Sequence, residues 1–460
     1  MSDQPLHVVV LAAGEGKRMN SGLPKVLQPV AERPMLEHLL RAARALNPAR
    51  IHVVVGHGAE QVAGRLAGLD DDRLCTVEQH QRLGTGHAVE QALPDVPDAA
   101  RVLVLPGDMP LVRERTLRRF ADNDAPLAVL SFVADDPFGY GRIVRDDDRR
   151  VLGIVEQRDA SDREARIREV NSGVLAADAA RLAGWLTRVD NANSQAEYYL
   201  TDCIGLAVAD GDRVEAVLCD DADELRGAND MAQLAGLERV LQQRRRGELL
   251  ARGVRMPAPE TVQVRGRVET GRDVVLDTGA VLEGEVTLGD GVRIGTGCVV
   301  RDSRLAAGTR VEPHSLLDGV ETTGAATLGP FARLRPGTVL AAGVRVGNFV
   351  ETKNARFAEG AKASHLTYVG DAEIGARVNL GAGTITCNYD GAEKHLTIIG
   401  PDAFVGSNSA LVAPVAVGEG ATIGAGSVVS GEVPAGALTV ARARARTIPG
   451  WKRPSKKDDG

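Results

Sequence analysis

Residues 276–300 read LDTGAVLEGEVTLGDGVRIGTGCVV, and the aliphatic residues of this stretch recur every six positions without a slip. A helix repeats its apolar face about every 3.6 residues and a strand about every two, so neither element alone explains a period of six. A solenoid does, because each hexapeptide can supply one short strand and a turn, and stacked coils share an aliphatic interior. The stretch therefore predicts a parallel β-helix. The aliphatic positions of this and the later blocks are Leu276, Leu282, Leu288, Ile294, Val300, Leu305, Val311, Leu317, Leu328, Leu334, Leu340, Val346, Ile399, Val405, Leu411, Val417, Ile423 and Val429.

Two stretches interrupt the period of six. They are residues 352–368 and residues 387–394, the second of which reads CNYDGAEK. Interruptions of a solenoid usually form loops on one face, often the binding face. Tolerated surface insertions are the alternative explanation.

The first half of the chain has a different pattern. Short β-rich runs alternate with helical patterns, which is typical of a mostly parallel sheet covered by helices. These runs lie at 7–13, 51–55, 101–105 and 126–133. From residue 229 to about 253, leucines at helical spacing predict a connecting helix. We therefore expect an α/β chain with three parts: a Rossmann-like domain at 1–228, a connecting helix at 229–252, and a β-helix domain at 253–460 that ends in a basic tail at 442–457.

Composition excludes several classes of protein. The 460 residues are 43% hydrophobic and 25% charged, which argues against a disordered, fibrous or membrane protein. A net charge of −7 opposes non-specific binding to nucleic acid. The five cysteines lie far apart without a CxxC pair, and no apolar run is long enough for a leader or a membrane span. We expect a cytoplasmic protein with no nucleic-acid or membrane partner.

A glycine loop follows the first predicted strand. Residues 11–19 read LAAGEGKRM, and LPK follows at 23–25. Glycines after a parallel strand let backbone N–H groups approach a phosphate. Arg18 and Lys25 are two cations beside the loop, and they suit a triphosphate whose charge must be neutralised during reaction. The alternative is a strand–helix turn with solvated basic residues.

Each half of the chain contains one side chain that is a candidate for a chemical role. The first half has a carboxylate, Asp108, and the second has an imidazole, His365. The run at 101–105 ends in Pro106-Gly107-Asp108, and the carboxyl ends of parallel strands are where ligands bind. Asp108 is a hard oxygen ligand suited to Mg²⁺ beside phosphates. His365 lies in the first interruption, within SHLTY at 364–368. An imidazole there can act as a general base, although a lone histidine is more often structural.

The string LAAGxGxRM followed by LPK resembles the signature of sugar-1-phosphate nucleotidyltransferases. Together with EYYLTD at 197–202, SHLTY at 364–368 and GAGTITCNYD at 381–390, it makes the chain resemble the bifunctional GlmU family over residues 7–451. The resemblance implies a nucleotidyltransferase domain before a left-handed β-helix, and a homotrimer. It implies acetyl transfer from acetyl-CoA to glucosamine 1-phosphate, then Mg²⁺-dependent uridylyl transfer from UTP to N-acetylglucosamine 1-phosphate, for peptidoglycan and lipopolysaccharide synthesis.

The resemblance also implies residues of the uridylyl site. Arg18 and Lys25 would be catalytic, Asp108 and Asn229 would hold Mg²⁺, and Gln79 would read the uracil base. For Asn229 a helix N-cap is an equally good reading of the sequence alone. The position before Gly107 is often Tyr in this family, and this chain has Pro106. The implied nucleotide- and sugar-binding residues are Leu11, Ala12, Ala13, Gly14, Lys25, Gln79, Gly84, Thr85, Pro106, Gly107, Asp108, Gly141, Glu156, Asn171 and Asn229.

For acetyl transfer the resemblance implies His365 as the general base and two sets of binding residues. The sugar-phosphate set is Arg335, Lys353, Tyr368 and Asn379, and the acetyl-CoA set is Ala382, Asn388, Tyr389, Ser407, Ala425 and Arg442. Two other functions remain possible from the residues alone. The chain could be a nucleotidyltransferase whose β-helix only assembles or regulates it, or a sugar-nucleotide sensor without activity. His365 with Asn388 and Tyr389 argues against the first, and Arg18, Lys25 and Asp108 argue against the second.

Overall fold

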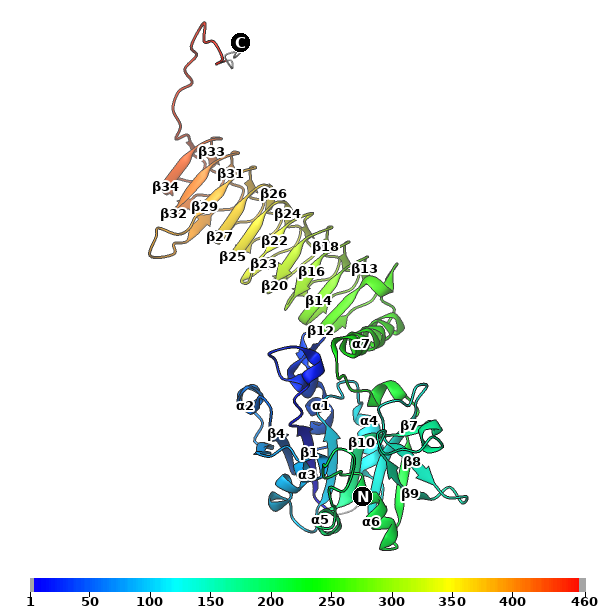
Figure 1. Cartoon of the computed structure of the whole chain (residues 1–460). Helices are drawn as coiled ribbons and strands as arrows, with labels where there is room; N and C mark the ends of the chain where they lie inside the picture. The colour runs from blue at the N-terminus through cyan, green and yellow to red at the C-terminus, as the bar shows by residue number, and fades with distance from the viewer. Residues whose placement is uncertain (1–3, 455–460) are drawn as a thin grey trace, which may run out of the picture. The chain divides into compact units, whose positions relative to one another are not determined.

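The structure, a computed structural model, describes residues 4–454. The chain divides into two compact units, Met1–Gln242 and Gln243–Gly460. The division falls within the long helix α7 (Met231–Ala251), which confirms the connecting helix predicted from the sequence (Figure 1).

A mostly parallel sheet forms the centre of the first unit. The strand order is β11-β7-β10-β6-β1-β4-β5, in which β10 runs antiparallel to β6 and β7. The four predicted strands are confirmed to within one residue at each end. The strands of this unit are β1 (Leu6–Ala12), β2 (Pro29–Val30), β3 (Arg33–Pro34), β4 (Arg50–Val55), β5 (Leu74–Glu78), β6 (Arg101–Pro106), β7 (Leu127–Val133), β8 (Arg142–Arg145), β9 (Val151–Val155), β10 (Glu169–Asp178) and β11 (Val214–Leu218).

Helices cover both faces of this sheet. Alternate residues of β1 enter different cores: Val8 and Val10 pack with α1, α2 and α4, whereas Val9 packs with α3, α5 and α6. A strand buried on both faces needs apolar residues at successive positions, which explains the unbroken apolar run in β1. The helices are α1 (Met35–Arg44), α2 (Ala59–Ala67), α3 (Thr85–Ala92), α4 (Glu114–Ala121), α5 (Ala179–Leu186) and α6 (Asp202–Ala209).

The second unit consists of stacked coils of short parallel strands (Figure 1). Leu276 pairs with Ile294, and Ile294 pairs with Val311, so one coil contains about three hexapeptides. The periodic aliphatic residues are buried and form one continuous core. The period of six therefore predicted this fold correctly.

The strands of the second unit are β12 (Gln263–Thr270), β13 (Val275–Leu276), β14 (Val281–Leu288), β15 (Arg293–Ile294), β16 (Val299–Arg301), β17 (Arg304–Leu305), β18 (Arg310–Val311), β19 (Leu316–Asp318), β20 (Val320–Thr322), β21 (Thr327–Leu328), β22 (Arg333–Leu334), β23 (Thr338–Leu340), β24 (Arg345–Asn348), β25 (Glu351–Phe357), β26 (Lys362–His365), β27 (Tyr368–Ile374), β28 (Asn379–Leu380), β29 (Ile385–Cys387), β30 (Thr397–Ile399), β31 (Phe404–Val405), β32 (Ala410–Val417), β33 (Thr422–Ile423), β34 (Val428–Val433) and β35 (Leu438–Thr439).

The predicted interruption at 352–368 is wrong. Strands β25 and β26 continue the ladders there, with Thr352 paired to Val369 and Val346 paired to Ala363. Thr352 and Ala363 point inward and are fully buried. The Thr352 hydroxyl satisfies its hydrogen-bonding need with Thr338 Oγ1 at 2.9 Å. Small and hydroxyl-bearing residues thus replace the larger aliphatic ones without opening the coil.

The interruption at 387–394 is confirmed as a loop between β29 and β30. Tyr389 and Lys394 form an isolated antiparallel bridge across it, and Asp390 Oδ1 accepts the backbone N–H groups of Ala392 and Glu393. The basic tail is exposed from Arg442 to Pro454, and the rest of its predicted extent, residues 455–457, lies outside the described residues. None of the helices in residues 4–454 has the length and apolar character needed to cross a membrane.

Candidate active sites

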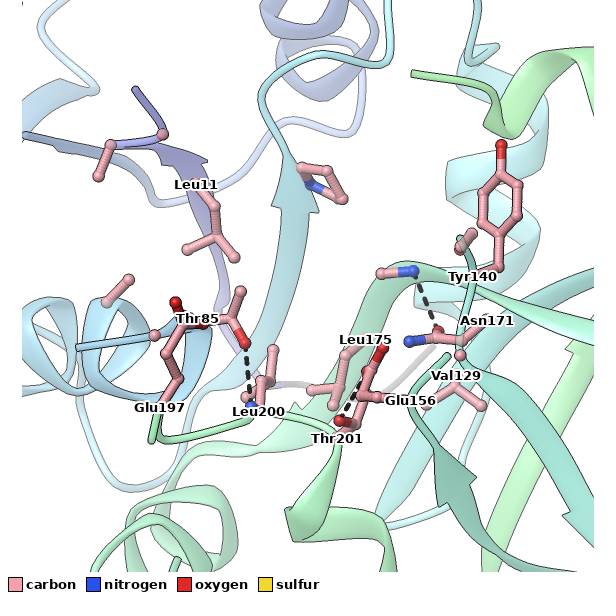
Figure 2. A pocket seen from close by; sticks show the side chains of 18 of the residues that line it. Leu11, Thr85, Val129, Tyr140, Glu156, Asn171, Leu175, Glu197, Leu200 and Thr201 are labelled. Carbon is pink, nitrogen blue, oxygen red and sulfur yellow. Dashed lines mark hydrogen bonds between the residues drawn. The ribbon is translucent and has the colours of Figure 1, made fainter. Parts of the chain in front are cut away.

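A cavity of about 700 Å³ opens in the first unit at the carboxyl ends of β1 and β6 (Figure 2). It collects residues from several loops and strands that are far apart in the sequence. The predicted residues that line it are Leu11, Ala13, Gly14, Gln79, Gly84, Thr85, Pro106, Gly141, Glu156 and Asn171. The cavity therefore brings the predicted nucleotide and sugar residues into one place.

The loop before α3 is locked to the segment that carries EYYLTD. The Tyr198 N–H donates to the Leu83 carbonyl oxygen at 2.7 Å, and the Leu200 N–H donates to Thr85 Oγ1 at 3.0 Å. A Cβ at Gly84 would lie 2.5 Å from the Tyr198 carbonyl oxygen, and Gly84 has a φ of 116°. Only glycine suits that position, so the loop can close this side of the cavity tightly.

Lys25, Asp108 and Asn229 form a separate cluster beside the glycine loop at 11–19, which is predicted to bind phosphate and is called the phosphate loop below. Lys25 Nζ lies 2.5 Å from Asp108 Oδ2 and 2.7 Å from Asn229 Oδ1. Asp108 follows Gly107, whose N–H donates to the Leu11 carbonyl oxygen at 2.9 Å, and Lys25 lies against Gly16, where a Cβ would be 2.7 Å from Lys25 Cβ. One cation thus bridges two oxygens of the two predicted metal ligands. This geometry shows that Asp108 and Asn229 are close enough to share a positive charge.

The alternative reading of Asn229 as an N-cap is not supported by its contacts. Asp230 Oδ1, rather than Asn229, accepts the Gln233 N–H at 2.8 Å in the first turn of α7. The Asn229 side chain turns to Lys25 instead. Asp230 therefore caps the helix, and the adjacent Asn229 contacts Lys25.

The remaining predicted residues of the first unit lie outside the cavity lining. Ala12 is buried in β1. Arg18 is exposed on the short turn Lys17–Met19, which follows the phosphate loop. The structure thus gathers Lys25, Asp108 and Asn229 but leaves Arg18 in solvent at the edge of the loop.

The end of the cavity near Glu156 and Asn171 holds half-buried carboxyl groups. Thr201 Oγ1 donates to Glu156 Oε1 at 3.0 Å, and Asn171 Oδ1 accepts the Gly173 N–H at 3.0 Å (Figure 2). Burial raises the pKa of Glu156. Burial, reinforced by the carboxylates of Asp190, Glu156 and Asp159, raises the pKa of Asp202 to about 6. These groups make the end of the cavity rich in acceptors for hydroxyl and amide hydrogens.

Sequence analysis missed an apolar wall and a polar rim. Val129, Leu175, Leu200 and Ile204 line the cavity, but in sequence they look like ordinary core residues. Arg82 and Glu15 lie at the rim, where Arg82 Nη1 donates to Glu15 Oε2 at 3.2 Å. No local pattern distinguishes a strand residue that faces a cavity from one that faces a helix.

In the second unit, His365 lies exposed at the end of β26. Its Nδ1 is 2.6 Å from Asn348 Oδ1, and the two residues are register partners in adjacent coils. The amide oxygen can only accept, so this bond places the proton on Nδ1 and leaves the Nε2 lone pair available. That is the form of imidazole a general base requires.

A charged cluster lies on β25 and β27 and on the segments that follow β22 and β29. Arg335 Nη1 donates to Glu351 Oε1 at 3.0 Å, and neighbouring Lys394, with Arg335, lowers the pKa of Lys353. Tyr368 Oη and Asn388 Nδ2 converge: a Cβ at Gly370 would lie 2.3 Å and 2.9 Å from them. The structure therefore groups Arg335, Lys353, Tyr368 and Asn388.

Asp371 is a member of this cluster that sequence analysis missed. It is 9% exposed, and its carboxylate accepts from Asn354 Nδ2 at 2.7 Å and from Asn388 Nδ2 at 2.5 Å. Burial opposes ionisation, but these two bonds and the charges of Lys394 and Lys353 outweigh it and lower the pKa of Asp371. Asp371 lies in the sequence YVGDAEI at 368–374, which contains no motif that would indicate this role.

Four of the six predicted acetyl-CoA residues, Ala382, Ser407, Ala425 and Arg442, form a column along one corner of the coils. The Asn408 N–H donates to the Ala382 carbonyl oxygen at 2.8 Å, and the Gly426 N–H donates to the Ser407 carbonyl oxygen at 2.8 Å. Arg442 donates to the Ala425 carbonyl oxygen. Tyr389 is exposed on the loop, and Asn379 lies on β28 opposite Lys362 and Phe404. The column leaves a line of small residues along which an extended ligand can lie.

Comparisons with known proteins agree with this organisation. Residues 8–169 match the MobA-like NTP transferase domain, and residues 396–431 match the bacterial transferase hexapeptide (six repeats). The chain is 56% identical over 454 residues to the bifunctional protein GlmU of Stenotrophomonas maltophilia (strain K279a), with 99% of both chains covered. It is 55% identical to the bifunctional protein GlmU of Xanthomonas axonopodis pv. citri (strain 306), over 98% of this chain and 99% of that one. It is also 55% identical to the bifunctional protein GlmU of Alkalilimnicola ehrlichii, over 99% of this chain and 98% of that one. The chain therefore belongs to the GlmU family of bifunctional uridylyltransferases and acetyltransferases, which make UDP-N-acetylglucosamine for peptidoglycan synthesis.

Proposed function

We propose that the first unit performs uridylyl transfer with Mg²⁺ held by Asp108 and Asn229. The observation that carries this proposal is the position of Lys25 Nζ, within 2.7 Å of an oxygen of each residue. A carboxylate and an amide oxygen are hard ligands, and Mg²⁺ needs only one or two protein contacts beside phosphates. The bound ion would neutralise charge on the triphosphate and on the departing pyrophosphate.

Lys25 acts with this pair of oxygens. An ammonium group held beside the phosphate loop can turn from the two oxygens to a phosphate with little movement of its stem. Arg18, exposed on the adjoining turn, is free to reach the same anion from the solvent side. The sugar phosphate oxygen then attacks the α-phosphorus in line, and pyrophosphate leaves without a covalent intermediate on the protein.

The cavity binds the two reacting molecules at opposite ends. The loops of Ala12, Ala13, Gly14 and Gly107 approach the phosphates, and Gln79, Gly84 and Thr85 surround the base. Gly141, Glu156 and Asn171 bind the sugar, where buried acceptors favour its hydroxyl and N-acetyl hydrogens. Pro106 supplies part of the apolar wall of the cavity.

We propose that the second unit performs acetyl transfer with His365 as general base. Asn348 fixes the Nδ1 tautomer, so Nε2 can take the ammonium proton of glucosamine 1-phosphate as its nitrogen attacks the thioester. Arg335, Lys353, Tyr368 and Asn379 bind the sugar phosphate. Ala382, Asn388, Tyr389, Ser407, Ala425 and Arg442 hold acetyl-CoA along the corner column.

The working form is proposed to be a homotrimer joined through the second unit. An apolar ladder of His314, Phe331, Phe349 and Leu366 follows one corner of the coils. Its rings stack at 5.1 Å and 5.5 Å between centroids, yet Phe349 is 58% exposed and Leu366 61%. Such a contiguous exposed apolar patch is typical of a contact surface. Leu366 adjoins His365 and Phe349 adjoins Asn348, so a neighbouring chain on this ladder would close the acetyl site.

The functional parts would follow the boundaries expected from the sequence. We assign residues 1–228 to uridylyl transfer, 229–252 to the connecting helix, and 253–460 to acetyl transfer. All five cysteines are free thiols, which suits the reducing cytoplasm.

Two variants of the full chain test the division of labour. Asp108→Ala should abolish uridylyl transfer, measured as pyrophosphate release, and keep acetyl transfer. His365→Ala should lower acetyl transfer, measured as free CoA thiol, by about 10²- to 10⁴-fold and keep uridylyl transfer. Loss of both activities in either variant, or of neither, would contradict the assignment.

A further inference from the structure

The amide of Gln79 is held in one orientation by two acceptors. Gln79 follows β5, lines the cavity and is only 4% exposed. Its Nε2 donates to the Gly84 carbonyl oxygen at 3.1 Å and to His87 Nδ1 at 3.0 Å. A backbone carbonyl can only accept, so the NH₂ end of the amide must be the end that faces Gly84. Both amide hydrogens are then used inside the protein.

The carbonyl end of the Gln79 amide is consequently left for the ligand. Within residues 4–454, no hydrogen bond to Gln79 Oε1 from another side chain or backbone group is present. Uracil carries a donor at N3, whereas cytosine carries an acceptor at the same ring position. A fixed acceptor in the cavity therefore binds the N3–H of uracil and repels the N3 lone pair of cytosine. A flipped amide would reverse this preference.

His87 contacts the side-chain amide of Gln79 through Nδ1 but does not itself line the cavity. It is half-buried on the first turn of α3, and its Nε2 is 3.4 Å from the side-chain amide of Gln91, one turn further along the helix. The Gln91 atom in this contact is its Nε2, which is a donor. For His87 Nδ1 to accept from Gln79, His87 Nε2 must carry the proton, and the Gln91 amide must then turn its carbonyl oxygen toward it. The lone pair that His87 presents to Gln79 therefore goes with that orientation of Gln91.

We propose that His87 is a positioning residue that sets the preference for UTP over CTP by fixing the direction of the Gln79 amide. The proposal rests on the proposed function of Gln79 as the residue that reads the base. With His87 in place, two acceptors oppose a flip of the amide. Without it, only the Gly84 carbonyl does.

Two substitutions of nearly equal size separate this role from packing. In His87→Asn the side-chain Oδ1 takes the place of Nδ1 and still accepts. In His87→Leu a methyl group takes that place and cannot accept. Glu90→Leu, at an exposed position of the same helix, is the matched control for a new leucine on α3. Each variant is made in the full chain, and circular dichroism with thermal denaturation reports on folding of the first unit.

The measured quantity is kcat/KM for UTP divided by kcat/KM for CTP, with N-acetylglucosamine 1-phosphate as the acceptor. His87→Leu should lower this ratio by about tenfold, the value of one hydrogen bond to the amide. His87→Asn should retain it within about threefold. A ratio for His87→Leu equal to that of the wild type and of Glu90→Leu would overturn the proposal. Should His87→Leu fold poorly, His87→Ala is measured in the same way, with the same loss expected.

Gln79→Leu distinguishes failure of this inference from failure of the proposed function. It should remove most of the UTP preference if Gln79 reads the base. If Gln79→Leu loses the preference and the His87 variants keep it, only the role of His87 is wrong. If Gln79→Leu keeps the preference, base reading by Gln79 is wrong, and the role of His87 is rejected with it.

Discussion

The two units of the chain surround their candidate residues in different ways. The first unit encloses a cavity of about 700 Å³ with loops and strands of a single chain. In the second unit, His365 is exposed beside an apolar ladder whose Phe349 is 58% exposed. Open parallel sheets gather side chains at the carboxyl ends of their strands, whereas a coil of short strands presents only flat faces and corners. This difference is why we propose that the first site is complete in one chain and that the second is completed by a neighbouring chain.

The largest expected difference concerns metal removal. Chelation of divalent ions with EDTA should lower uridylyl transfer by about 10³-fold or more, because several kcal/mol of charge stabilisation are lost. Acetyl transfer by the same sample should not change, since His365 and its partners need no metal. Pyrophosphate release and CoA release are measured in parallel, and added Mg²⁺ should restore the first. Persistence of uridylyl transfer in EDTA would remove the metal role of Asp108 and Asn229.

A negative charge placed on the apolar ladder should have the reverse effect of metal removal. It should impair acetyl transfer by the second unit and leave uridylyl transfer by the first unit intact. Phe349→Glu buries an unpaired carboxylate in the proposed contact, so the trimer should dissociate and acetyl transfer should fall by about 10²-fold. Uridylyl transfer should stay unchanged. Light scattering gives the mass, and Leu438→Glu, at an exposed leucine away from the ladder, is the control. A monomeric variant with full acetyl transfer would show that the second site is also complete in one chain.

Asp371→Asn should affect stability and activity together. The substitution removes the charge that Asn354, Asn388 and two lysines share, and we expect a loss of about 1–3 kcal/mol in unfolding free energy at pH 7. The lowered pKa means that this contribution is present above the ordinary value of 3.8 and disappears as the pH falls through the lower folded value. Acetyl transfer should fall by about tenfold, since one hydrogen bond orienting Asn388 is weakened.

Denaturant unfolding at pH 7 and at pH 2–3 checks this expectation. Asp402→Asn is the matched control, because Asp402 pairs with Arg377 at the surface and its loss should matter less. Equal effects of the two substitutions would show that the Asp371 cluster is an ordinary surface ion pair.

The smallest expected effect is a gain in stability. The pKa of Asp202 is raised to about 6, so the folded first unit carries an unfavourable charge above that pH. Asp202→Asn should therefore raise the melting temperature by a few degrees at pH 8, about 2–4 °C for each kcal/mol. The gain should shrink as the pH falls through 6 towards the ordinary value of 3.8, where the wild-type group is neutral in both states.

Thermal denaturation across this pH range, with the exposed Asp98→Asn as control, measures the effect. A gain that does not depend on pH would mean that packing, rather than charge, is responsible.

The sequence by itself determined the architecture of the second unit and four of the eleven strands that the structure describes in the first, β1, β4, β6 and β7. A period of six leaves few alternatives, because every aliphatic residue must face one narrow interior. The exception at 352–368 is instructive: Thr352 and Ala363 also fill that interior, so the solenoid continues where the aliphatic pattern stops. Local pattern also located the glycine loop after β1 and Asp108 after β6, because strand ends are set by local pattern.

Only the tertiary structure decided which atoms meet. Lys25 and Asn229 are separated by 204 positions, and no local pattern could place one ammonium between Asn229 and Asp108. The direction of the Gln79 amide depends on Gly84 and His87, and the apolar wall depends on which face of β7 and β10 a helix leaves uncovered. Sequence periodicity reports which side of an element is buried, whereas hydrogen-bond partners across the fold depend on distances set only by packing.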